Sequence, residues 1–198
     1  MKAGDRFPDG IDRDKIAEGV RLILDAIGED ASRAGLRKTP QRVAESYAEL
    51  FSGIAVDPAS VLEPLPGERG DGLIMVRDIP LTGMCEHHLL PFIGTAAVAY
   101  LPGEDGRICG LSKLARVVAV LSRRPQVQER LVADVADAME KALSPRAVFV
   151  YVEAEHLCMT MRGAQKPGSI TVTSEWRGLW REEPGLRAEV IALARSRE

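Results

Sequence analysis

The sequence predicts an α+β protein in which an antiparallel sheet is backed by a pair of helices and follows a helical N-terminal segment. Two pairs of short β-rich runs, bounded by Pro and Gly, lie within 73–101 and within 148–176. Two stretches with apolar residues at helical spacing separate these pairs, and two more precede them. Strands and helices that occur in groups, here in the order ββαα–ββ, are typical of an α+β domain.

The composition is that of an ordinary globular chain. Its 198 residues are 45% hydrophobic and 28% charged, which allows a buried core. A net charge of -3 supplies no broad basic field, so we expect no nucleic-acid partner, although a small anionic ligand is compatible. The N-terminus lacks the apolar segment of a signal peptide, and no run of eighteen apolar residues occurs. We therefore expect a cytoplasmic protein with no membrane segment.

Two helices are predicted near the N-terminus. Asp12 is placed to cap a helix that runs to about Ile27, and Thr39 is placed to cap a second one with Pro40 at its first position. The first helix carries an apolar stripe at helical spacing. Its members are Ile16, Val20, Ile23, Leu24 and Ile27.

From residue 73 the pattern changes to strands and paired helices. The predicted strands are 73–79, 92–101, 148–154 and 169–176. Ser112 is placed to cap one helix, and Pro125 to open the next. The apolar face of this second helix is Val127, Leu131, Val135, Met139 and Leu143. Residues 184–196 are expected to form a last amphipathic helix.

The predicted organisation is one compact unit with three parts. A helical segment, 1–52, is followed by a connecting segment, 53–72, and by the sheet-containing part, 73–198. The connecting segment holds three prolines and four glycines with little periodicity. No linker is long enough to separate independent domains.

All three histidines and two of the three cysteines fall in two short windows, 85–88 and 156–158. Cys85 and His88 have the C-x-x-H spacing with which one tight turn presents a thiolate and an imidazole to the same ion. If 148–162 stays extended, the period of two places Cys158 on one strand face with other polar groups. These are His156, Thr160 and Arg162.

Three ligands, Cys85, His88 and Cys158, would leave the fourth position of a tetrahedral zinc to water, which is the arrangement of a catalytic site. Soft thiolates with imidazole favour zinc over magnesium or calcium. Bound zinc lowers the pKa of water from ~15.7 to about 7. The remaining histidines, His87 and His156, are then available to move protons near neutral pH.

Other interpretations of these residues remain open. Taken singly, a cysteine is more often a small buried hydrophobe and a histidine more often packs than ligates, but packing does not explain the clustering. A disulfide between Cys85 and Cys158 is the rival for that pair, and a reducing cytosol disfavours it. Cys109 has no histidine nearby and is expected to pack.

A second group of polar residues could hold a nucleotide. Ser112, Lys113 and Arg116 open one predicted helix, where unpaired N–H groups attract phosphate. Further candidates are Gln128, Glu129, Arg162, Lys166 and Arg42. Considered alone, charges on amphipathic helices are usually a solvated face. A carboxylate such as that of Glu129 can, however, accept paired N–H groups from a guanine edge.

Four motifs in this order resemble those of the GTP cyclohydrolase I family, over residues 36–178. They are MCEHHLLPFIGTAAVAYLP, GLSKLARVV, RRPQVQERL and EAEHLCMTMRGAQKPGSITVTS. Several ordered motifs are far more specific than one short pattern. The tail from Glu175 onward fits the family pattern only loosely.

The resemblance implies a zinc enzyme that opens the imidazole ring of GTP at C8, releases formate and closes a new ring to 7,8-dihydroneopterin triphosphate. Cys85, His88 and Cys158 match the zinc ligands, and His87 and His156 match the catalytic histidines. Glu129, with Gln128 beside it, matches the guanine site. The positions matching the triphosphate site are Ser112, Lys113, Arg116, Arg162 and Arg42. The implied fold is the tunnelling fold, assembled into a toroidal homodecamer with active sites between subunits.

Rival functions use the same residues differently. A zinc-stabilised nucleotide-binding module would hold a ligand without turnover, although structural zinc normally has four protein ligands and three are evident here. A zinc deaminase would need the H-x-E and P-C-x-x-C pattern, which this sequence lacks. A cysteine hydrolase using Cys85 and His156 would keep its activity when zinc is removed.

Overall fold

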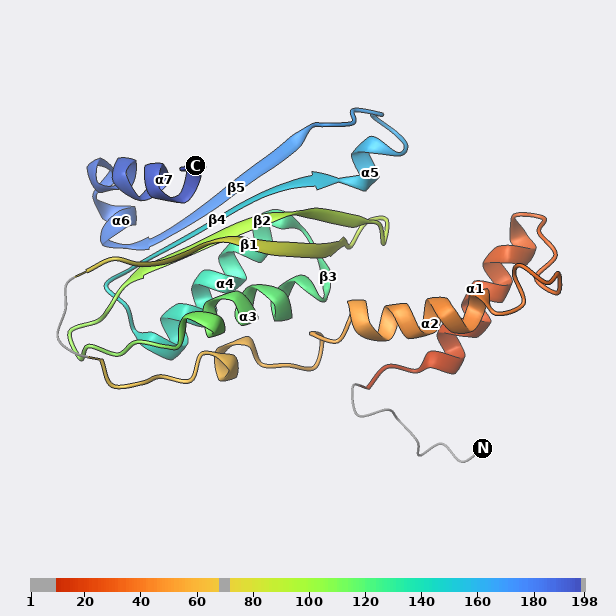
Figure 1. Cartoon of the computed structure of the whole chain (residues 1–198), viewed down its shortest axis with the longest axis horizontal. Coiled ribbons are helices and arrows are strands. Elements are labelled where there is room, and N and C mark those ends of the chain that lie inside the picture. The colour runs from red at the N-terminus through yellow and green to blue at the C-terminus, as the bar shows by residue number, and fades with distance from the viewer. Residues whose placement is uncertain (1–9, 68–71, 197–198) are drawn as a thin grey trace. The chain divides into compact units, whose positions relative to one another are not determined.

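The computed structural model describes residues 10–67 and 72–196 (Figure 1). Its internal contacts divide the chain into two compact units, Met1–Ala55 and Val56–Glu198. The boundaries predicted after residues 52 and 72 stay predictions. Within the described ranges, no helix combines the length and the apolar character needed to cross a bilayer.

The N-terminal unit is built from two helices in contact, α1 (Arg13–Ala26) and α2 (Thr39–Leu50). The Asp12 cap is confirmed, because its carboxylate accepts a hydrogen bond of 3.0 Å from the Lys15 N–H. Two members of the apolar stripe, Ile23 and Ile27, are 61% and 71% exposed in the chain. The interior uses a narrower face rich in small side chains. Its buried members are Ala17, Leu24, Pro40, Ala44 and Ala48.

The second unit contains a five-stranded sheet with the order β3-β1-β2-β4-β5. Neighbouring long strands are antiparallel, whereas β3 pairs with β1 in parallel. The bounds are β1 (Ile74–Cys85), β2 (Pro91–Leu101), β3 (Pro125–Gln126), β4 (Ala147–His156) and β5 (Ile170–Gly178). All four predicted strands are present, and β1 continues six residues beyond its predicted end. That extension carries the chain to Cys85.

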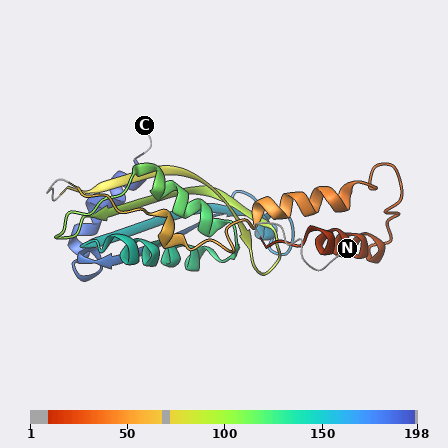
Figure 2. The ribbon, with the colours of Figure 1, turned by 90° about the horizontal axis from the view of Figure 1, so that it is seen from below.

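Helices α3 (Leu111–Ser122) and α4 (Gln128–Leu143) cover one face of the sheet, and Figure 2 shows them side by side. The apolar face predicted for the second helix is confirmed in four of its positions, which are fully buried. They are Leu131, Val135, Met139 and Leu143. Alternate residues of β2 and β4 pack against this helix pair, so the main core lies between the sheet and the helices.

The opposite face of the sheet is covered at one end by the C-terminal elements (Figure 1). The expected last helix is α7 (Arg187–Arg195), and a short 3-10 turn, Pro184–Leu186, takes the place of its first residues. Helix α6 (Leu179–Glu182) was not predicted, and it buries Trp180 against Phe149 and Tyr151 in a second, smaller core.

Three predicted helix starts are displaced. Helix α2 has Thr39 as its first helical residue rather than its cap, and α3 begins after Gly110, so that Ser112 is its second residue. Pro125 does not open α4, because it lies in β3, where it pairs with Met84. Because β3 lies between α3 and α4, the strict order ββαα–ββ is not confirmed, although the α+β class is.

The buried face of α4 predicts the effect of a core truncation. Replacing Leu131 by Ala should lower the free energy of unfolding by about 2–5 kcal/mol, because the side chain is fully buried between α4 and the sheet. Leu186, 47% exposed, is the control, and its change to Ala should cost less than about 0.5 kcal/mol. Urea unfolding at one fixed protein concentration measures both. Equal losses would contradict the assigned core.

Candidate metal centre and active site

The end of the β1–β2 hairpin presents the first two sulfur and nitrogen donors. β1 ends at Cys85 and β2 begins at Pro91, and the turn is closed by hydrogen bonds of 2.9 Å from Leu89 N–H to the Cys85 carbonyl and from Cys85 N–H to the Leu90 carbonyl. Within this turn, Cys85 Sγ and His88 Nδ1 lie 3.9 Å apart. The C-x-x-H spacing therefore brings both side chains to one point, as the sequence predicts.

The third donor arrives from the far end of β4. Antiparallel pairing places His156 opposite Phe92, beside the hairpin end. The condition that the chain stays extended through residue 162 is not met, because β4 ends at His156 and α5 (Leu157–Thr160) follows. This single helical turn redirects the chain at the hairpin end. Cys158 reaches the other two donors from α5, and not from a strand face.

The donor atoms of Cys85, His88 and Cys158 all lie within 4.8 Å of one another. No fourth His, Cys, Asp or Glu joins this group in the described parts of the chain. Burial raises the pKa of the Cys158 thiol, and the neighbouring Cys85 raises it further. A cation between the two sulfurs would oppose this effect and favour thiolates. Two sulfurs and one imidazole nitrogen are a donor set that suits zinc.

The other side of the His88 ring faces a cation. Arg162 Nη1 lies 2.8 Å from His88 Nε2, and a guanidinium can only donate, so Nε2 accepts in this structure. Nδ1 is then the nitrogen that faces Cys85. Cys85 is buried, Cys158 is half-buried and His88 is exposed, so the cluster is reached from one side.

His156 is held by two contacts that the sequence did not reveal. Its ring stacks on Phe92, with centroids 4.8 Å apart and planes 12° from parallel. Its Nε2 lies 2.7 Å from Gln128 Oε1. Burial lowers the pKa of His156, and the negative charge of Glu129, on the first turn of α4, acts in the opposite direction. His156 is thus fixed in position beside the candidate metal ligands.

Gly83 on β1 makes room for the Phe92 ring. A β-carbon at this position would lie 2.6 Å from Phe92 Cε2 and 2.7 Å from Cε1. Only a residue without a side chain fits there while Phe92 keeps its place. A pattern of alternating residues gave no signal for this contact, because it depends on which strand lies next to β1.

His87 stands in a different environment. Its side chain is 64% exposed, and Nε2 lies 3.8 Å from the Glu86 carboxylate. Glu86 is paired with Arg130, which lowers the pKa of Glu86 and which also donates to Gln126 Oε1 at 2.7 Å. The link from Glu86 to Arg130 was not predicted, since these residues are 44 positions apart in the chain.

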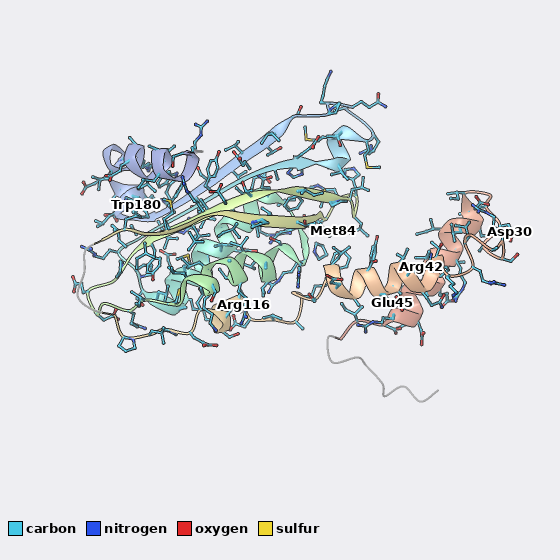
Figure 3. All side chains as sticks on the ribbon, in the orientation of Figure 1. Asp30, Arg42, Glu45, Met84, Arg116 and Trp180 are labelled. Atoms are coloured by element: carbon cyan, nitrogen blue, oxygen red, sulfur yellow. The ribbon has the colours of Figure 1, made fainter. Side chains whose placement is uncertain are left out.

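The remaining predicted site residues lie elsewhere. Ser112, Lys113 and Arg116 are on the first turns of α3, whose other end, Ser122, borders the hairpin residues Thr82 and Ile93. At 1.5 Å per residue, Ser112 is about 15 Å along the helix from Ser122. Figure 3 shows Arg116 well away from Met84, the neighbour of Cys85.

Lys113 has a partner of its own, and two further predicted positions have other surroundings. Lys113 forms an ion pair of 2.8 Å with Glu63. Arg42 belongs to the N-terminal unit, on α2. Cys109 is buried, as predicted, and its N–H donates to Tyr100 Oη at 3.2 Å. All three cysteines are free thiols, so the rival disulfide between Cys85 and Cys158 is not formed here.

Together, the fold and the site define an α+β protein with a candidate catalytic metal centre. The chain belongs to the GTP cyclohydrolase I family, whose sequence model matches residues 16–195. The resemblance found in the motifs is thereby confirmed.

Curated relatives named GTP cyclohydrolase 1 match almost the whole chain. The relative from Caldanaerobacter subterraneus subsp. tengcongensis is 57% identical over 187 residues, covering 94% of this chain and 99% of the relative. That from Mycobacterium tuberculosis is 53% identical over 182 residues, covering 92% and 90%. Among solved structures, the archaeosine synthase QueF-Like in the apo form gives a TM-score of 0.45 at 15% identity, over 56% of this chain and 97% of that one. A likeness of that size does not assign the fold.

The packing of Gly83 under Phe92 generates a prediction. Gly83→Ala should lower the free energy of unfolding by about 1–3 kcal/mol, because the added β-carbon forces the Phe92 ring out of its place. Gly185→Ala is the matched control, since a β-carbon there meets nothing within 4 Å. Thermal and urea unfolding measure the difference. A Gly83→Ala protein as stable as the control would contradict the close approach.

Proposed function

We propose that this chain catalyses the GTP cyclohydrolase I reaction. Water opens the imidazole ring of GTP at C8, formate leaves, and a new ring closes to give 7,8-dihydroneopterin triphosphate. The observation that carries the proposal is the Cys-His-Cys donor set beside His156, in a chain of this family. The same site also has a cation, Arg162, at its rim.

Cys85, His88 and Cys158 would hold a zinc ion. The fit rests on the donor chemistry, because two sulfurs and one imidazole nitrogen converge and the described residues offer no fourth ligand. When bound with an open position, zinc supplies a Lewis acid that makes water a nucleophile near neutral pH.

The two histidines outside the ligand set would move protons. His156 is fixed by Phe92 and Gln128, whereas His87 is exposed and close to Glu86. This difference suits one firmly placed group at the reacting ring and one that contacts the more open part of the substrate. Glu129, exposed at the start of α4, would accept N–H groups of the guanine edge, with Gln128 beside it.

The triphosphate site would be completed by a second copy of the chain. Within one protomer, Arg162 lies at the metal end, whereas Ser112, Lys113 and Arg116 lie at the far end of α3. Copies related by a ring symmetry bring opposite ends of neighbouring protomers together. In the described residues β5 pairs only with β4, so its outer edge is open to another strand. We therefore propose the tunnelling fold, a homodecamer and inter-subunit active sites, with Arg42 as a further phosphate ligand.

Activity and metal dependence are tested together with GTP. Purified, zinc-loaded protein should release formate and a pterin that fluoresces after oxidation, and a chelator should stop both. Cys158→Ser should lose zinc and more than about 100-fold in activity, since even groups that only support metal ligands contribute 10–100-fold. Cys109→Ala, outside the cluster, should keep both. Zinc-loaded protein that binds GTP without formate release would instead be a binding module.

A mixing experiment tests the shared site. His156→Ala and Arg116→Ala proteins should each be inactive, but assemblies formed from both in equal amounts should recover about a quarter of the wild-type rate, because a quarter of the sites receive both intact residues from neighbouring copies. Assemblies of each variant alone, treated identically, are the controls. No recovery in verified mixed assemblies would contradict a site built from two copies.

A further inference from the structure

Gln128, the first residue of α4, is one of the few buried polar side chains, at 1% exposure. Its Nε2 lies 3.1 Å from the Val152 carbonyl, 3.0 Å from the Thr171 carbonyl and 3.1 Å from Thr173 Oγ1. Its Oε1 lies 2.7 Å from His156 Nε2. The side chain thus joins β4 and β5 to the candidate catalytic histidine.

The surroundings allow only one orientation of this amide. Two of the three groups around Nε2 are backbone carbonyls, which can accept but not donate. If the amide were turned over, Oε1 would face two carbonyl oxygens in a site closed to water, leaving acceptors buried without donors. The NH₂ group therefore points at the strands, and Oε1 points at His156.

The fixed amide determines which nitrogen of the neutral His156 ring carries the hydrogen. Oε1 is an acceptor, so His156 Nε2 must carry a hydrogen in order to donate to it. In the neutral ring, Nδ1 is then the nitrogen with the free lone pair. Turning the ring over would place a C–H against Oε1, and the stacking on Phe92 keeps the ring plane fixed.

We propose that Gln128 is a positioning residue that holds His156 as the Nε2–H tautomer, so that Nδ1 is the atom that accepts a proton in the reaction. The part of this proposal that concerns proton transfer rests on the proposed function, whereas the tautomer follows from the structure alone. It also assigns the Gln128 carboxamide to His156, and leaves Glu129 as the side chain that meets the guanine edge.

The tautomer can be measured without substrate. Zinc-loaded protein labelled with ¹⁵N-histidine contains only three histidines, and His156→Asn identifies the signals of His156 by their loss. At mildly alkaline pH, where the ring is neutral, solid-state ¹⁵N spectra should show a protonated Nε2 and an unprotonated Nδ1. A protonated Nδ1 would overturn the proposal, and this result needs no variant of Gln128 to fold.

Variants then test the effect on turnover. Gln128→Met keeps the length but removes both hydrogen-bonding ends, so it should lose the fixed tautomer and about 10–100-fold in kcat, with KM for GTP changed by less than about threefold. Gln128→Glu, as the neutral acid, still offers an acceptor to Nε2–H but has one O–H for the two carbonyls, so it should restore the tautomer and part of kcat. Wild-type kcat in a Gln128→Met protein with a mixed tautomer would overturn the positioning role.

A matched control removes only one contact. Thr173→Val takes away Oγ1 but leaves both carbonyls that orient the amide, so tautomer and kcat should stay as in the wild type. If Thr173→Val altered the tautomer as strongly as Gln128→Met, the two carbonyls would not fix the amide and the proposal would fail. Absence of formate release from the wild type would contradict the proposed function but not the tautomer.

Discussion

The antiparallel pairing of β2 with both β1 and β4 is the constraint on which the site depends. It places Met84 opposite Pro91 and Phe92 opposite His156, so residues some seventy positions apart in the chain end at the same edge of the sheet. A shift by one residue would turn Phe92 and His156 to the other face. The buried helix pair α3 and α4 prevents that shift, because it needs the alternate residues of β2 and β4 on its side.

The long elements could be predicted because their patterns persist over many residues. The four strands and the apolar face of α4 are examples, and four residues of that face, Leu131, Val135, Met139 and Leu143, are buried as expected. Short elements such as α5, α6 and β3 were not predicted. A segment of two to four residues shows too little periodicity, and its conformation depends on the elements that pack against it. Ile23 and Ile27 belong to the apolar stripe of α1 and are nevertheless exposed in the chain. Periodicity shows that a helix has an apolar face, but not how wide its contact is.

The convergence of Cys85, His88 and Cys158 could be predicted from residue type and clustering, whereas the way Cys158 reaches the cluster could not. An extended chain and a helical turn both bring Cys158 near His156, so the residue that joins the cluster could be named without knowing the local structure. The contacts that hold His156 in place were beyond sequence reasoning. Gly83, Phe92 and Gln128 lie on three different elements, and only their packing shows that they act on one ring.

Lys113, which is far from the candidate metal centre in one protomer, would have to give up an ion pair in order to bind another anion. In one protomer Lys113 is already paired with Glu63, whose side chain is 68% exposed. An ion pair with such an exposed partner contributes about 0–1 kcal/mol, so giving it up costs little. In the proposed triphosphate site, several negative charges would offer Lys113 a stronger partner than one solvated carboxylate. Under that proposal, the pair with Glu63 would keep the lysine neutralised until substrate arrives, without a large loss in substrate affinity.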